Sequence, residues 1–162
     1  MKILLLFFVL ITSQFSFAGP TLNRFTSDGC SNWPDGSIFD STLWKTCCFE
    51  HDISYWMGGT EKDRLKADET LKMCVGSRVH FMAGWVMYSG VRVGGGPGYY
   101  TPYRWGYGWS TPRGYKRLTP HEKETVEDEL ARTCFIGEEQ GIIERSMQEK
   151  KLKPVPRFKF YR

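Results

Sequence analysis

The sequence predicts a mainly helical fold that is stapled by disulfides, and three observations carry this prediction. Two helical segments, 43–57 and 60–74, are separated only by a short link that contains two glycines. A capping pattern at 119–122 opens a C-terminal helix. All five cysteines lie in the part of the chain that we expect to be exported, where disulfides persist.

The first eighteen residues have the pattern of a secretory signal peptide. Lys2 precedes an apolar run over residues 3–11, and the small-residue pattern Ser16-Phe17-Ala18 comes directly before Gly19. A run of nine apolar residues is too short for a membrane anchor, which needs about 20. We therefore expect a secreted or periplasmic protein. The expected divisions are a signal peptide (1–18), one globular domain (19–149) and a basic C-terminal tail (150–162).

Composition and charge exclude several other classes of protein. A chain of 162 residues predicts a single domain. Its 41% apolar and 25% charged residues are typical of a folded chain, not a disordered one. The formal net charge of +4 is too weak to indicate a nucleic-acid partner. Neither a GxxxxGK[ST] nor a GxGxxG phosphate-binding loop is present.

The first two helices have clear start and stop signals. Ser41 or Thr42 can cap the first helix, and Gly58-Gly59 suits the left-handed conformation that ends it. Thr60 then caps the second helix, which runs at least to residue 74 and at most to about residue 88. A link this short predicts an antiparallel helix hairpin.

Segment 84–118 holds nine glycines and nine aromatic residues and fits neither a helical nor a strand period. We therefore expect a long loop region there. Two interpretations stay open: an ordinary packed loop, or an amphipathic rim whose Trp and Tyr side chains settle at a membrane interface. After this region, Thr119-Pro120-His121-Glu122 forms a capping box, and the helix that it opens is expected to run to about Cys134.

The predicted hairpin places a histidine opposite an aspartate. Cys47, His51 and Tyr55 are four residues apart and share one face of the first helix. The second helix runs the other way and presents Asp68 before Cys74, so a Cys47–Cys74 disulfide would set Asp68 opposite His51. An aspartate on a histidine orients the ring and leaves the other nitrogen free as a general base.

Asp52 must point elsewhere, because successive helical residues diverge by about 100°. A Cys30–Cys48 disulfide would hold the turn-rich segment that carries Asp28 beside the start of the helix. Carboxylates and loop carbonyls are hard oxygen ligands of the kind that calcium prefers. A His–Asp pair beside an oxygen-ligated cation indicates metal-assisted hydrolysis with water as the nucleophile.

These residues resemble a known family. Segment 47–55, CCFEHDISY, resembles the helix motif C-C-x-x-H-D-x-C-Y of the secreted phospholipase A2 family. The loop with Asp28-Gly29-Cys30-Ser31 and Pro34-Asp35 is similar to the bacterial and fungal branch of that family. Ala67-Asp68, followed by a cysteine six residues later, fits the family's second helix. The resemblance covers about residues 26–76.

The resemblance implies a phospholipase A2-like antiparallel helix hairpin and a calcium-dependent enzyme that cleaves the sn-2 ester of glycerophospholipids. It implies that His51 activates the water, that Asp68 orients His51, and that Tyr55 hydrogen-bonds near Asp68. The implied calcium ligands are Asp28, Gly29 through its backbone, and Asp52. The implied partner is a phospholipid membrane or lipid aggregate.

The chain departs from the animal branch of the family in two respects. Ser54 stands where animal members have a third cysteine, with Ala67 at its partner position, so one disulfide between the helices is missing. The glycine-rich calcium loop of the animal enzymes is also absent. No resemblance covers residues 77–162.

Other interpretations of the same residues stay open. His51 can be a core histidine with a structural role only. Alternatively, the thiols of Cys47, Cys48 and Cys74 and the imidazole of His51 can be ligands of a zinc ion. In function, the alternative to an enzyme is a catalytically silent calcium-binding or lipid-binding module on the same scaffold. Cys134 is expected to be a buried free thiol or, alternatively, an intermolecular disulfide, and the basic tail is expected to be solvated or attracted to anionic lipid.

Overall fold

The computed structural model describes the fold of residues 19–139 and the side chains up to residue 133. Within this part of the chain the fold is mainly α and holds no β-strand, as the sequence predicts. The four helices are α1 (Lys45–Met57), α2 (Glu61–Arg78), α3 (Phe81–Gly94) and α4 (Pro120–Glu139). The predicted signal peptide, the basic tail and the side chain of Cys134 lie outside the described residues.

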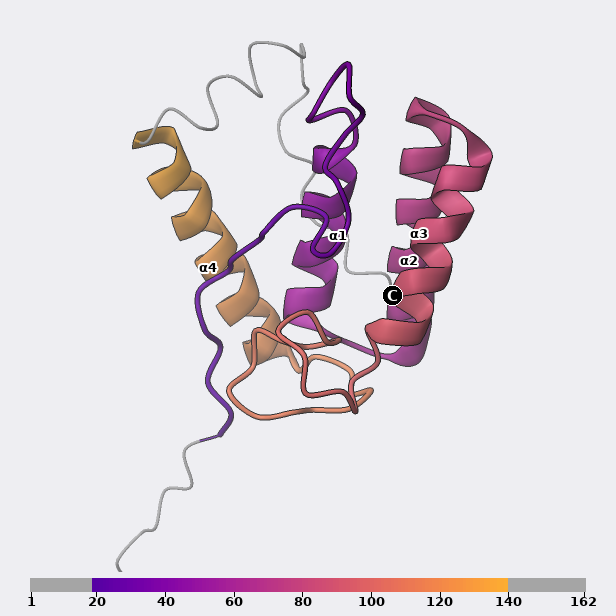
Figure 1. Ribbon diagram of the computed structural model, residues 1–162. Helices are drawn as coiled ribbons and strands as arrows, with labels where there is room; N and C mark the ends of the chain where they lie inside the picture. Colours follow the sequence, from indigo (N-terminus) through magenta and orange to yellow (C-terminus); the bar gives the residue numbers. More distant parts are fainter. Residues whose placement is uncertain (1–18, 140–162) are drawn as a thin grey trace, which may run out of the picture.

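Helix α1 occupies the middle of the fold (Figure 1). The pair α2 and α3 lies on one side of α1, and α4 lies on the other. Buried side chains of α1, α4 and the loops form one apolar cluster, in which Trp56 and Val126 are fully buried. A second cluster joins α1 to α2 and α3 through residues such as Leu71 and Val75. The loop after α3 runs beneath the C-terminal end of α1.

Both predicted disulfides are present. Cys30 is bonded to Cys48, with a Cα–Cα separation of 5.0 Å, and Cys47 is bonded to Cys74 at 5.8 Å. These bonds are typical of proteins in an oxidising, extracellular-type environment. They also exclude the zinc interpretation for the three thiols of that predicted cluster, because no thiolate is left to bind the metal.

The start of α1 differs from the prediction, whereas the start of α2 confirms it. Neither Ser41 nor Thr42 caps α1; the residue at its N-cap is Trp44, which makes no side-chain capping hydrogen bond. The Thr42 amide and hydroxyl both donate to Asp40 instead, so this threonine belongs to a turn before the helix. Thr60 forms a complete capping box with Asp63 at the start of α2.

The prediction of a loop throughout 84–118 is wrong for its first eleven residues, which belong to α3. Glycines at this density lower helix propensity, but tertiary packing outweighs that cost. At Gly84 a Cβ atom would collide with the backbone carbonyl of Lys72 on α2. Glycine therefore allows α2 and α3 to approach closely. Helix α3 is separate from α2, because α2 ends at Arg78 and the His80 side chain caps the next helix.

The rest of the glycine-rich and aromatic segment is a packed loop that closes the end of α1. The last carbonyls of a helix have no partners within it. Here the amides of Gly106 and Gly108 donate to the carbonyls of Tyr55 and Trp56, at 2.6 and 3.1 Å. The Trp109 indole donates to Met57 at 2.8 Å, and that of Trp105 donates to the carbonyl of Gly59 in the link after α1, at 3.0 Å. The packed-loop interpretation is thus correct for Trp105 and Trp109, which are both buried.

The C-terminal helix begins as the sequence predicts. The Thr119 amide donates to the Glu122 carboxylate at 2.7 Å, and the Glu122 amide donates to the Thr119 hydroxyl at 3.2 Å. The helix continues to Glu139, about one turn beyond its expected end. Among residues 19–139 there is no helix with the length and apolar character that a membrane crossing needs.

Candidate functional site

The two disulfides hold together the three segments that carry the predicted site residues. Cys47–Cys74 links the start of α1 to the second half of α2, and Cys30–Cys48 links the loop before α1 to the same turn of α1. Because the two cysteines of α1 are adjacent, the bonds leave the helix in different directions. Helix α1 therefore has α2 on one side and the 27–35 loop on another.

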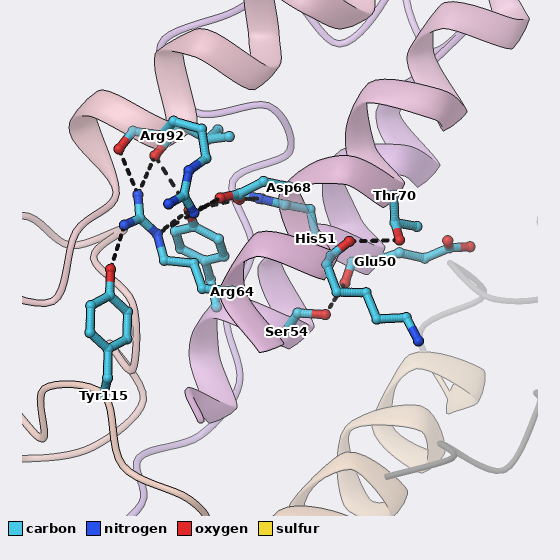
Figure 2. Close-up of polar contacts among 11 residues, drawn as sticks. Glu50, His51, Ser54, Arg64, Asp68, Thr70, Arg92 and Tyr115 are labelled. Atoms are coloured by element: carbon cyan, nitrogen blue, oxygen red, sulfur yellow. Dashed lines mark hydrogen bonds and ion pairs between the residues drawn. The ribbon is translucent and has the colours of Figure 1, made fainter. Parts of the chain in front are cut away.

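His51, Tyr55 and Asp68 meet between α1 and α2, as predicted (Figure 2 shows His51 and Asp68). His51 Nε2 lies 2.9 Å from Asp68 Oδ1, and the Tyr55 hydroxyl donates to the same oxygen at 2.8 Å. The rings of His51 and Tyr55 lie against each other, with their centroids 4.2 Å apart. Asp68 is fully buried, and His51 is 8% exposed.

The contact with Asp68 determines which nitrogen of His51 can accept a proton. Burial opposes ionisation of Asp68, but hydrogen bonds from His51, Arg92 and Tyr55 outweigh it and lower the pKa of this carboxyl. An ionised carboxylate can only accept hydrogen bonds, so Nε2 of His51 carries the proton that is shared with Asp68. In neutral His51 the lone pair is then on Nδ1, which is the nitrogen available as a base.

Two arginines that the sequence interpretation missed complete the surroundings of Asp68 (Figure 2). Arg92 Nη1 lies 2.7 Å from Asp68 Oδ2, and Arg64 Nε lies 3.8 Å from the same oxygen. A signal for Arg64 was present, because it precedes Asp68 by four residues and so shares its helix face. No comparable signal existed for Arg92, which reaches Asp68 only because residues 81–94 form a helix beside α2.

Arg64 joins the site to the rest of the fold. Its Nε donates to the Tyr55 hydroxyl at 3.0 Å, and Nη1 donates to the Tyr115 hydroxyl at 2.6 Å. Nη2 donates to the carbonyls of Val91 and Arg92 at the end of α3, both at 2.8 Å. This buried guanidinium thus connects α1, α3 and the loop that follows α3, and it fixes the position of Tyr55.

Asp52 lies apart from this network, as the helix geometry requires. One of its oxygens accepts a hydrogen bond of 2.6 Å from the Ser27 hydroxyl. The pKa of Asp52 is raised to about 7, chiefly by burial; the Ser27 hydrogen bond opposes the shift, and the negative charges of Asp28 and Asp35 contribute to it. Asp52 is therefore a buried carboxylate without a cationic partner among the described residues.

The 27–35 loop is organised by its own hydrogen bonds. Asp28 Oδ1 accepts from the Ser31 hydroxyl at 2.9 Å, and Asp35 Oδ1 accepts from the Cys30 amide at 2.8 Å. Gly29 has a positive φ of 81°, and a Cβ atom there would collide with the Asp35 carboxylate. Glycine is therefore required where the loop passes Asp35.

The chemistry of these groups suits a hard cation better than a soft one. The available donors are carboxylates, a hydroxyl and loop carbonyls, which are ligands that calcium prefers. The negative charges of Asp52 and Asp28 also raise the pKa of the nearby Tyr107, after the larger effect of its burial. Negative charge thus accumulates here, and the only ion pair that these two carboxylates and that of Asp35 form within the described residues is the one between Lys45 and Asp35, at 3.8 Å. Among the described residues, no group of three or more His, Cys, Asp or Glu side chains is arranged to hold a metal ion. Oxygens of the loop would therefore have to complete the ligand set of a calcium ion.

Comparisons with family profiles, with curated proteins and with solved structures find no match to this chain. The functional interpretation therefore depends on the motif and on the geometry described above.

Proposed function

We propose that this chain is an exported, calcium-dependent hydrolase similar to phospholipase A2, which cleaves the sn-2 ester of glycerophospholipids. The observation that carries the proposal is the 2.9 Å contact between His51 Nε2 and the buried Asp68 carboxylate. This contact lies on a disulfide-linked helix pair of the kind that the phospholipase A2 motif implies, and it leaves Nδ1 of His51 as the basic nitrogen. The two disulfides support export, which the leader-like residues 1–18 would direct.

In the proposed reaction His51 acts as the general base. Nδ1 takes a proton from a water molecule as the water attacks the ester carbonyl carbon, and His51 then returns that proton to the departing alcohol oxygen. Asp68 accepts the hydrogen bond from Nε2 throughout, so it holds the ring in place and stabilises the positive charge that forms on it. Asp68 itself takes no proton, because its hydrogen bonds hold its pKa low.

Calcium is proposed to bind beside this pair. Asp52, Asp28 and the backbone of Gly29 would hold the ion, which supplies Lewis-acid polarisation of the ester carbonyl when it is bound. The support for this part is the uncompensated Asp52 carboxylate and its two acidic neighbours. The thiols of Cys30 and Cys48, which lie nearest to this loop in the chain, are joined in a disulfide and leave only oxygen donors.

The proposal is tested with the purified, disulfide-bonded protein and a phospholipid that carries a labelled sn-2 acyl chain. We expect release of the label with calcium, none in excess chelator, and recovery when calcium is restored. His51→Gln should lower the rate by about 10²–10⁴-fold, because general-base catalysis contributes on that scale. A protein that binds calcium and lipid but releases no acyl chain would overturn the enzyme and establish the silent module.

A further inference from the structure

Acidic residues are absent from a long stretch in the middle of this chain. The 18 Asp and Glu residues lie in two regions, 28–69 and 122–149, so residues 70–121 hold none. The same stretch contains seven Lys and Arg residues. The net charge of the whole chain is modest, but this segment carries only positive charges. It comprises the end of α2, all of α3 and the loop up to α4.

Within this segment, α3 presents an apolar face to solvent. Residues 81, 82, 85, 86 and 93 lie within an arc of about 140° on a helical projection. We call these residues the α3 strip: Phe81, Met82, Trp85, Val86 and Val93, which are exposed by 59, 53, 49, 49 and 73%. The other exposed position in this arc is Ser89. Arg92 also falls within the arc, but its side chain is only 26% exposed and its guanidinium contacts Asp68, so the exposed part of the strip is apolar.

The strip is not the core-facing side of its helix. Helix α3 packs against α2 with the opposite face, on which Gly84 and Met87 are buried. A helix at the surface of a soluble domain normally turns polar side chains outward. Contiguous exposed apolar side chains of this size mark an interaction surface.

Basic side chains border the strip. The Lys72 ammonium on α2 lies 4.3 Å from the centroid of the Trp85 ring and 4.9 Å from that of Tyr88. Arg78 ends α2 next to the first residues of the strip. Arg92 lies in the last turn of α3, but its charge is balanced by Asp68, so Lys72 and Arg78 are the basic residues that border the strip. A strip of Phe, Trp, Met and Val with a basic border and no acidic residue in its segment complements a surface that is both apolar and anionic.

We propose that the α3 strip docks onto the surface of an anionic phospholipid bilayer. This inference deepens the proposed function, and the choice of lipid over a protein partner rests on that function. The charge pattern supports the same choice, because the lysine beside Trp85 would meet lipid phosphates while the aromatic rings enter the interface. A second copy of the chain suits the strip less well, since two such faces would bring their basic borders together.

The strip is also connected directly to the candidate site. Arg92 lies at the edge of the strip and reaches back to Asp68, and the carbonyl of the neighbouring Val91 accepts a hydrogen bond from Arg64. Docking through the outer face of α3 would therefore bring the His51–Asp68 pair close to the bilayer with a single helix between them.

The test measures binding to vesicles in excess chelator, so that lipid hydrolysis does not interfere. The vesicles contain either phosphatidylcholine alone or phosphatidylcholine with phosphatidylglycerol. We expect binding to the anionic vesicles, a blue shift of tryptophan fluorescence, and weaker binding at high salt. The double variant Phe81→Ser/Trp85→Ser should bind at least about tenfold more weakly, because two exposed aromatic side chains no longer enter the interface. Lys72→Gln should cost about fivefold, the equivalent of about 1 kcal/mol for one basic residue near the surface.

The matched control is Phe39→Ser. Phe39 is 93% exposed, but it lies beside Asp40 in the acidic part of the chain, so its loss should leave vesicle binding unchanged. Circular dichroism and intact disulfides will show that all variants are folded. The inference is overturned if the double variant binds as tightly as the unmodified protein, if Phe39→Ser loses as much, or if the protein is a dimer that only the double variant dissociates.

The test of membrane docking can be separated from the test of the proposed enzymatic activity. Cleavage of a short-chain phospholipid, dissolved as monomers and supplied with calcium, tests the catalytic site without any bilayer. The double variant should retain that cleavage, since none of its substitutions touches His51 or Asp68. Loss of vesicle binding together with unchanged cleavage of the monomeric substrate is the outcome that supports the α3 strip.

Discussion

Arg92 forms a close ion pair with Asp68, with Nη1 2.7 Å from Oδ2. The other oxygen of Asp68 faces His51, so one buried carboxylate holds both an imidazole and a guanidinium. Burial of a carboxylate is costly unless its charge is compensated. Tyr55 supplies a hydrogen bond but no positive charge, whereas Arg64 and Arg92 place permanent positive charge beside the carboxylate.

We expect Arg92→Met to lower the free energy of unfolding by about 2 kcal/mol, the scale for a hydrogen bond to a charged group. Arg92→Lys keeps the positive charge and should recover about half of the loss. Urea unfolding measures both. The control is Arg132→Met, because the Arg132 side chain is 72% exposed and its ion pair with Glu129 is long, at 3.7 Å, so it should contribute little. Equal stability of Arg92→Met and the unmodified protein would contradict the role assigned to this pair.

The His51–Asp68 contact could be predicted from the sequence, because it follows from local rules. A spacing of four puts Cys47, His51 and Tyr55 on one face, and a two-glycine link forces the next helix to run back. One disulfide then sets the register of the two helices. These steps need no information from beyond residue 74, and the structure agrees with each of them.

The surroundings of Asp68 could not be predicted in the same way. Arg92 depends on α3, and Gly84, which permits the close approach of α3 to α2, is one of the glycines that argued for a loop. Ser27, the hydrogen-bonding partner of Asp52, lies in a segment without periodicity. In both cases the position of the residue is determined by packing between distant segments and leaves no pattern in the local sequence.

Tyr55→Phe tests the second link between the two helices. The hydroxyl donates to Asp68 and accepts from Arg64, so its removal leaves a buried guanidinium donor and a carboxylate oxygen each with one partner fewer. We expect a loss of about 1–2 kcal/mol in the free energy of unfolding. The control is Tyr99→Phe, which removes a hydroxyl from a half-exposed ring and should change little. If thermal unfolding of the two variants is the same, Tyr55 acts through packing only.

The two disulfides should contribute similarly to the free energy of unfolding, but one should affect calcium binding and the other the turnover rate. They close loops of 18 and 27 residues, and loop entropy predicts about 3–4 kcal/mol for each. Removal of Cys30–Cys48 by double substitution with Ala should chiefly weaken calcium binding, because it frees the loop that carries Asp28. Removal of Cys47–Cys74 should chiefly lower the turnover rate, because it loosens His51 from Asp68. Calorimetry with calcium and the acyl-release assay separate the two effects, and identical losses in both variants would contradict this division.

Without calcium, the pH dependence of the free energy of unfolding should show how much the ionisation of buried Asp52 destabilises the fold. Its pKa is raised to about 7 in the folded protein and has its ordinary acidic value in the unfolded chain. Between these two values the folded state binds more protons than the unfolded state, so the free energy of unfolding falls as the pH rises from about 4 to about 7. Asp52→Asn removes this dependence and, in chelator at pH 8, should be more stable than the unmodified protein by on the order of 2–4 kcal/mol.

Added calcium should reverse that order. An ion bound only by the folded state raises stability according to its concentration relative to its dissociation constant. We therefore expect calcium to raise the melting temperature of the unmodified protein at pH 8 and to leave that of Asp52→Asn unchanged. The control is Glu50→Gln, which removes an exposed carboxylate from the same helix and should respond to calcium like the unmodified protein. If calcium raises the melting temperature of Asp52→Asn equally, the ion binds elsewhere. If the unmodified protein is more stable than Asp52→Asn in chelator at pH 8, another group already compensates the charge of Asp52.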